Sequence, residues 1–211
     1  MDAAVNAQAR KLVIACGALA HEIAALREAN GWSALDVKCL PPELHNRPER
    51  IAGAVRGQIR ENRDRYDEIF VAYADCGTGG ALDAVLREEG VERIAGAHCY
   101  EFFATPAVFA ALAAAEPGTF YLTDFLLRHF DRLVIRGLGI DRHPELQAVY
   151  FKNYRRLVYL GQAPDKEATG KAEAIAARLG LEYRYQSTGY GGLKESLVAF
   201  AGNARTARWR A

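Results

Sequence analysis

Three cysteines in this chain follow short apolar runs. Cys16 comes after LVIA, Cys76 after IFVAYAD and Cys99 after RIAGAH. If these runs are parallel strands of one sheet, the three thiols share its carboxyl edge, where open α/β folds place their ligand sites. Thiolates bind zinc and iron–sulfur clusters, and a bound metal relieves their mutual repulsion. The sequence therefore predicts a metal centre held by Cys16, Cys76 and Cys99.

Polar residues near these cysteines are candidates for catalysis. His98 and Glu101 flank Cys99, Asp75 precedes Cys76, and His45 follows the second predicted strand. Each is a candidate fourth ligand, orienting group or proton carrier. Three protein ligands with one open position are typical of a catalytic zinc site. A four-iron cluster held by three cysteines also leaves one iron open, so zinc and an iron–sulfur cluster both remain candidates.

Two other interpretations of the cysteines stay open. Free cysteine packs well as a small residue, and the three positions fit tight strand ends. Alternatively, Cys99 acts with His98 and Glu101 as a metal-free thiol catalyst, which requires a lowered thiol pKa. Cys39 lies inside the run LDVKCL and is expected to be a buried small hydrophobe.

Two glycine-rich turns are candidate phosphate sites. The first contains Gly77, Thr78 and Gly79, and the second contains Tyr190 and Gly191. Backbone amides in such a turn, at the start of a helix, can bind an anion. Neither turn matches the Walker or dinucleotide pattern. The competing interpretation is a tight turn that needs glycine for a positive φ.

Alternating strands and helices are expected to position these residues. The predicted strands are residues 12–15, 35–40, 68–73, 92–96, 119–122, 156–160 and 181–186. The predicted helices are residues 19–30, 48–64, 80–89, 124–132, 144–154 and 166–179, an Ala-rich helix after Glu101 and a final helix after Gly192. This order predicts an α/β fold with a mostly parallel sheet, helices on both faces and Rossmann-like layered units. Right-handed crossovers place every strand-to-helix turn on one edge.

Length and composition limit the class of protein. The 211 residues fit a single α/β domain over 1–211, and the alternative is two tightly packed α/β halves of about 1–110 and 111–211. The net charge of +1 predicts neither nucleic-acid nor membrane binding, and the three arginines at 205–210 are expected to form a solvated helix end. No apolar run approaches the ~20 residues of a membrane span, and no secretory signal is found. A cytoplasmic location with reduced cysteines is expected.

Several segments together resemble a known family. They are CGALAHEI, LPPELHNRPE, YADCGTGG, RIAGAHCYEFF, PGTFYLTDFL, LGIDRHPEL, YFKNYRRLVYL and STGYGGL. The chain resembles the domain of unknown function 1638 family over roughly residues 11–200, with Ala74 where that family often has glycine. The resemblance implies no established activity. It implies a setting beside corrinoid-dependent methyltransferase systems, such as those acting on methylamines or betaines.

The residues and the resemblance together lead to one functional hypothesis. The protein is expected to be a cytoplasmic metalloprotein and an enzyme that acts on a small-molecule substrate. The resemblance adds a corrinoid protein or a methyltransferase as the implied partner. The alternative is a non-catalytic accessory protein that binds a corrinoid, a metal or a methyltransferase.

Overall fold

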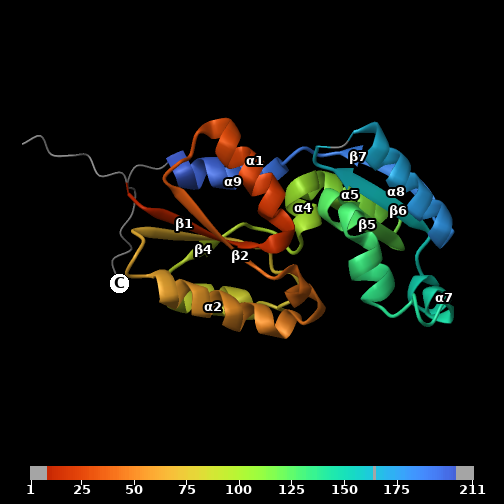
Figure 1. The fold of residues 1–211 in the computed structure, drawn as a ribbon, viewed down its shortest axis with the longest axis horizontal. Helices are drawn as coiled ribbons and strands as arrows, with labels where there is room; N and C mark the ends of the chain where they lie inside the picture. The colour runs from red at the N-terminus through yellow and green to blue at the C-terminus, as the bar shows by residue number, and fades with distance from the viewer. Residues whose placement is uncertain (1–8, 164, 203–211) are drawn as a thin grey trace, which may run out of the picture. The chain divides into compact units, whose positions relative to one another are not determined.

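Two parallel β-sheets organise the chain in the computed structural model, which describes residues 9–163 and 165–202 (Figure 1). The first sheet belongs to unit 1, which contains the chain up to His98 and again from Leu193. The second sheet belongs to unit 2, residues Cys99–Gly192. Every strand pair in both sheets is parallel, so the predicted α/β fold is confirmed. The arginine-rich segment 205–210 lies outside the described residues.

Unit 1 is built around a four-stranded sheet. Its elements are β1 (Lys11–Cys16), η1 (Gly17–Leu19), α1 (Ala20–Asn30), β2 (Leu35–Leu40), η2 (Pro42–Asn46), η3 (Pro48–Arg50), α2 (Ile51–Asn62), β3 (Glu68–Ala72), α3 (Ala81–Glu89), β4 (Glu92–Arg93) and most of α9 (Gly191–Gly202). The strand order is β2-β1-β3-β4. The chain leaves β1 for β2 on one side and returns as β3 on the other. The carboxyl ends of β1 and β3 therefore flank a topological switch point, where open α/β sheets bind ligands.

Helices cover both faces of this sheet. Figure 1 shows α1 and α9 on one side of the strands and α2 on the other. Helix α2 buries Ile51, Val55 and Ile59, which share one apolar face of the helix. On the other face, the Phe200 ring of α9 stacks on Phe70 of β3 with 5.2 Å between ring centroids. All six residues of β1 are buried, as is typical of a parallel strand covered on both sides.

Unit 2 is built around a three-stranded sheet. Its elements are α4 (Cys99–Ala104), α5 (Pro106–Ala115), β5 (Thr119–Thr123), α6 (Asp124–Arg128), the π-helix η4 (Asp131–Arg136), α7 (Glu145–Phe151), β6 (Arg156–Gly161), α8 (Lys166–Leu179) and β7 (Glu182–Ser187). The strand order is β5-β6-β7. The Thr123 hydroxyl caps α6 by accepting a hydrogen bond from the Leu126 amide at 3.3 Å.

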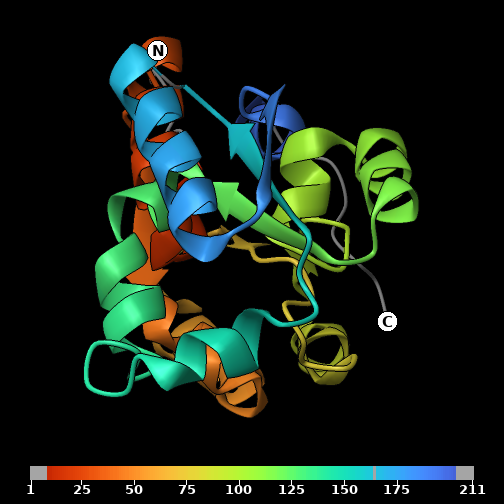
Figure 2. The ribbon, with the colours of Figure 1, turned by 90° about the vertical axis from the view of Figure 1, so that its right-hand side faces the viewer.

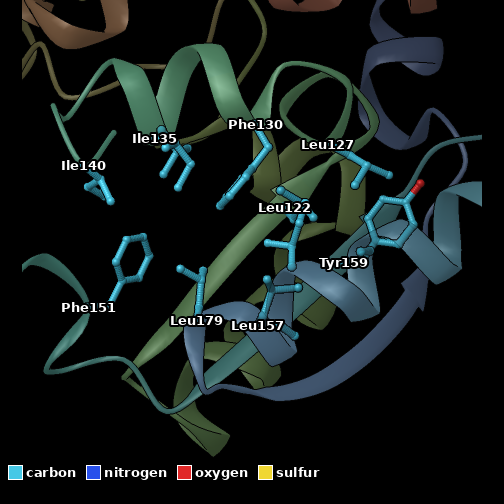
Figure 3. Packing of buried hydrophobic residues seen from close by; sticks show 13 residues of the cluster. Leu122, Leu127, Phe130, Ile135, Ile140, Phe151, Leu157, Tyr159 and Leu179 are labelled. Atoms are coloured by element: carbon cyan, nitrogen blue, oxygen red, sulfur yellow. The ribbon is translucent and has the colours of Figure 1, made fainter. Parts of the chain in front are cut away.

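The central strand β6 sends alternate side chains to two apolar clusters. Leu157 and Tyr159 pack in the larger cluster, with residues of β5, α6, η4, α7 and α8 (Figure 3). Val158 and Leu160 pack in the smaller cluster on the other face, with Ala104 of α4 and side chains of α5. Figure 2 shows α8 on one side of these strands and α4 with α5 on the other. Because successive side chains of a strand point to opposite faces of the sheet, the short strand β6 contributes to both apolar clusters.

The structure differs from the sequence prediction at four places. Strand β4 contains two residues instead of 92–96, and the helix expected over 124–132 divides into α6 and a π-helix. Cys39 is exposed, so its prediction as a buried residue was wrong. The reason is that β2 is an edge strand with incompletely covered faces. The chain passes between the units twice, at 98–99 and at 192–193, because α9 returns to the first sheet. The alternative division expected from the sequence lay near residue 110.

No helix in the described ranges, 9–163 and 165–202, is long and apolar enough to span a membrane.

Candidate functional site

Cys16 occupies the carboxyl end of β1, beside the switch point of the first sheet. Its sulfur accepts a hydrogen bond from the Ala18 amide at 3.3 Å and lies 3.7 Å from His45 Nδ1. Gly17 follows, and a Cβ there would lie 2.9 Å from the Leu40 carbonyl oxygen, so glycine lets the ends of β1 and β2 approach. Burial raises the pKa of Cys16 to about 12. The thiol is therefore protonated at neutral pH unless a cation compensates its charge.

His45 lies on η2, directly after β2. Its Nδ1 is 3.1 Å from the Pro42 carbonyl oxygen, and since a carbonyl only accepts, Nδ1 carries the proton and Nε2 the lone pair. The ring stacks on Tyr73, with 6.3 Å between centroids and 12° between planes. Although the residue as a whole is exposed, burial of its ring lowers the pKa of His45. The imidazole is therefore neutral near pH 7, the form that binds metals.

Tyr73 continues the chain beyond β3 and is 1% exposed. Its hydroxyl has no hydrogen-bond partner among the described residues. Burial raises the pKa of Tyr73, and the Cys16 thiol raises it further. The thiol is thus close enough to perturb the hydroxyl but is not placed for a hydrogen bond of normal geometry. An unpaired buried hydroxyl costs about 1–3 kcal/mol, so it marks a position where a water or a ligand atom would be stabilising.

Cys76 lies in the loop after β3, in a conformation that side chains rarely adopt. Its φ is 52°, which costs a residue with a Cβ roughly 1–2 kcal/mol. The Cys76 amide donates to the Ala97 carbonyl at 2.9 Å, and the Asp75 amide donates to the Gly96 carbonyl at 3.0 Å. These bonds tie the loops after β3 and β4 together and maintain the strain. Burial raises the pKa of Cys76 to about 11, so this thiol is also neutral.

Asp75 organises the first glycine-rich turn. Its carboxylate accepts hydrogen bonds from the Thr78 hydroxyl at 2.5 Å, the Gly79 amide at 3.1 Å and the Gly80 amide at 3.0 Å. The bond from Thr78 is the largest cause that lowers the pKa of Asp75. Gly77 has a φ of 81°, as expected of a tight turn. The amides that a phosphate would use therefore already bind the carboxylate of Asp75, which positions the loop that carries Cys76.

The residues around the third cysteine lie at the passage between the units. His98 ends the unit 1 segment and is exposed, and its charge lowers the pKa of His45, which places the two rings within electrostatic range. Cys99 and Glu101 are half-buried in α4, the first helix of unit 2. Unit 1 thus brings together Cys16, His45, Tyr73, Cys76 and His98. Within either unit, the described residues contain no group of three or more His, Cys, Asp or Glu side chains that could hold a metal ion. The three-thiolate centre stays a prediction.

The second glycine-rich turn packs against the end of α4. Gly189 and Gly191 have φ values of 55° and 42°. A Cβ on Gly191 would overlap the carbonyl oxygens of Phe102 and Phe103. Close packing of two backbone segments therefore accounts for glycine at position 191, while Tyr190 beside it is half-buried.

Replacing Gly191 by alanine is expected to lower the free energy of unfolding by about 2–4 kcal/mol, because the new methyl group overlaps backbone oxygens and the positive φ is unfavourable. Denaturant unfolding followed by circular dichroism measures this change. Gly170→Ala is the matched control, since Gly170 lies in α8 with nothing near its Cβ position, and it is expected to stabilise by about 0.5–1 kcal/mol. Equal stability of the two variants would contradict the packing argument.

One buried polar network in unit 2 was absent from the sequence prediction. The Asp124 carboxylate accepts hydrogen bonds from the Tyr159 hydroxyl at 2.8 Å, the Gln162 amide at 3.1 Å and the Ala163 amide at 2.9 Å. It joins the carboxyl ends of β5 and β6. The available signal was an acidic residue directly after a buried strand.

Comparison with known proteins assigns the chain to a family. A family model described as protein of unknown function (DUF1638) matches residues 39–197, and no curated protein matches the chain. The matched segment includes His45, Cys76 and Cys99 and begins after Cys16. Since the match spans most of the chain, the chain belongs to the DUF1638 family of proteins of unknown function.

Proposed function

We propose that this protein is a cytoplasmic metalloprotein in which Cys16, Cys76 and His45 bind a thiophilic metal, either zinc or the iron of an iron–sulfur cluster. The proposal rests on one observation: the Cys16 sulfur faces His45 Nδ1 at 3.7 Å beside the switch point of the first sheet. The four cysteines, all of them within the described residues, form no disulfide bond, in agreement with a reducing compartment.

The distance between these two donors fits a shared metal. Zinc binds sulfur at ~2.3 Å and nitrogen at ~2.0–2.1 Å, so two donors of one tetrahedral zinc lie roughly 3.5 Å apart. The 3.7 Å between Cys16 Sγ and His45 Nδ1 is close to this value. Metal binding at Nδ1 would move the proton of the ring to Nε2 and replace the hydrogen bond to Pro42.

The second thiol and the tyrosine add to this donor set. The charge of Cys76 raises the pKa of Cys16, so the two sulfurs lie within electrostatic range, and both are too desolvated to ionise alone. A cation supplies the missing stabilisation. The buried Tyr73 hydroxyl, which has no hydrogen-bond partner among the described residues, lies close enough to the Cys16 thiol to change its pKa. Cys99, the third predicted cysteine, begins α4 of unit 2 and is a further candidate thiolate in this proposal, with Glu101 and His98 nearby in sequence as candidate proton carriers.

A bound metal would act as a Lewis acid toward a thiol or a methyl-bearing small molecule. We place this chemistry beside corrinoid-dependent methyl transfer because of the family resemblance, with a corrinoid protein or a methyltransferase as partner. The residues of the chain would hold the thiolates, orient the imidazole through stacking on Tyr73 and keep the Cys76 loop in place through Asp75.

Metal analysis of anaerobically purified protein tests the proposal. We expect about one zinc per chain and no colour, or about four irons with a brown absorption band. Cys16→Ser and Cys76→Ser are each expected to lower the metal content at least about tenfold, because each removes a thiolate. Cys39→Ser is the matched control, since Cys39 is exposed on the edge strand β2, and it is expected to keep the wild-type content. Metal-free wild type, or full metal content in Cys16→Ser, would overturn the proposal.

Cys99→Ser in the same series tests the third ligand. If Cys99→Ser loses as much metal as Cys76→Ser, the result supports a three-thiolate centre. If Cys99→Ser keeps the wild-type metal content, the site belongs to unit 1 alone. Demethylation of methylcobalamin in the presence of a thiol then separates an enzyme from an accessory protein. Acceleration by the metal-loaded protein supports catalysis, whereas co-purification with a corrinoid protein without acceleration supports the accessory role.

A further inference from the structure

Unit 2 contains a basic cavity remote in sequence from the three cysteines. Its volume is about 480 Å³, and residues of α6, η4 and α8 line it. Five of the lining side chains are cationic: Arg128, Arg132, Arg136, Lys171 and Arg178. The one lining carboxylate belongs to Asp131, and it is paired with Arg178 at 3.2 Å. The volume lies within the range of small-molecule sites.

The helical phase of two segments explains why the cations gather there. Leu127 of α6, Phe130 just before η4 and Ile135 of η4 point toward the strands in Figure 3. The three arginines, spaced four residues apart from 128 to 136, therefore follow the opposite side of these turns. On α8, the buried residues are Ala172, Ile175, Ala176 and Leu179, while Lys171 and Arg178, seven residues apart, are exposed. The two basic rows line the same cavity.

The cavity carries an excess of positive charge that its own residues do not neutralise. Within the described parts of the chain, neither Arg136 nor Lys171 has an ion-pair partner. Since the whole chain has a net charge of only +1, this local excess is a feature of the cavity and not of the composition. Two such cations in one cavity, Arg136 and Lys171, favour a ligand with two negative charges.

A second cavity of about 270 Å³ adjoins the first and shares Leu127, Arg128 and Lys171 with it. Its remaining lining includes the carboxylates of Asp165 and Glu167 and the polar groups of Asp124 and Tyr159. Carboxylates accept hydrogen bonds from hydroxyl and amino groups but repel anions. The two cavities therefore suit the two ends of one ligand, with its anionic groups toward the arginines and hydroxyl or amino groups toward the carboxylates.

We infer that this pair of cavities binds a small organic phosphate that carries at least two negative charges and a remainder rich in hydroxyl or amino groups. Arginine is the side chain best suited to phosphate oxygens, which it binds through two parallel hydrogen bonds. A nucleic acid fits less well. Its backbone needs an extended series of cations, whereas here all five cations line the first cavity and the adjoining cavity adds carboxylates.

Titration of the full-length protein with fructose 1,6-bisphosphate, used as a probe with two phosphates and free hydroxyls, tests the inference. At about 50 mM salt we expect saturable binding with a Kd below about 1 mM, measured by calorimetry. The double variant Arg136→Gln/Lys171→Gln is expected to weaken binding at least about tenfold, because it removes two cations from the cavity. Neither residue has an ion pair in the described structure, so the fold is expected to stay intact, which circular dichroism checks.

The matched control is Lys152→Gln/Lys166→Gln, which removes the same charge from exposed positions of unit 2 outside both cavities. Less than about twofold weakening is expected in this control. Three results would overturn the inference: absence of saturation below about 10 mM, equal weakening in both double variants, or sulfate binding as tightly as the bisphosphate. Tighter binding of single-stranded DNA than of the bisphosphate would also overturn it, in favour of a nucleic-acid site.

Discussion

Raising the pH from 7 to 8 is expected to increase the metal affinity of the protein by about 100-fold. The thiols of Cys16 and Cys76 have pKa values raised to about 12 and 11, so both are protonated over this range in the metal-free protein. Each must release a proton to bind the metal, and each released proton contributes about tenfold per pH unit. His45 adds no proton, because burial keeps its pKa below the usual value and its ring is already neutral. Competition with a coloured chelator at several pH values measures the slope.

The pH dependence of metal affinity in variants counts the thiolate ligands. In Cys76→Ser the affinity is expected to rise about tenfold per pH unit, since one thiol remains. In Cys39→Ser it is expected to rise as in the wild type. A wild-type slope of about a thousandfold would add Cys99 as a third ligand. A slope of tenfold or less in the wild type would contradict the assignment of both Cys16 and Cys76.

Replacing Asp124 by alanine is expected to lower the free energy of unfolding by about 3–5 kcal/mol. The substitution leaves three donors without their acceptor: the Tyr159 hydroxyl and the amides of Gln162 and Ala163. Each buried donor left unpaired costs about 1–3 kcal/mol, and Tyr159 and Gln162 are both buried. Because Asp124 connects the ends of β5 and β6, the loss is expected to affect the whole second sheet. Urea unfolding, with hydrogen exchange of the β5 and β6 amides, measures the total and its location.

Two further variants separate the network from a general effect of charge. Tyr159→Phe removes one of the three hydrogen bonds and leaves the carboxylate with two amide donors, so a cost of about 1–1.5 kcal/mol is expected. Asp141→Ala removes an exposed carboxylate of the same unit and is expected to change stability by less than about 0.5 kcal/mol. A cost for Asp124→Ala no larger than that for Tyr159→Phe would show that the two amide bonds contribute nothing.

Local sequence patterns determined most of the secondary structure. Residues 12–16 and 157–160 are continuous apolar runs because parallel strands are covered on both faces, so β1 and β6 could be predicted closely. The same pattern failed for β4, where only Glu92 and Arg93 pair with β3. It also failed for Cys39, because burial of a strand residue depends on whether its strand is central or at an edge, and that order is a long-range property.

The division into two sheets also depended on contacts between distant residues. Strand-helix alternation looks the same whether the strands join one sheet or two, since every unit of the repeat is local. Most of helix α9 belongs to unit 1, because its Phe200 ring packs on Phe70 of β3, which lies far earlier in the sequence.

The candidate site shows the same distinction. The sequence by itself indicated that Cys16, His45 and Cys76 follow strands that end at one edge, because parallel strands align their carboxyl ends. Only the tertiary structure decided that Asp75 binds its own loop and that the Tyr73 hydroxyl has no hydrogen-bond partner among the described residues. The basic cavity likewise forms only where α8 meets α6 and η4. Hydrogen-bond partners and cavities depend on which distant side chains come within a few ångströms, and sequence spacing does not encode that distance.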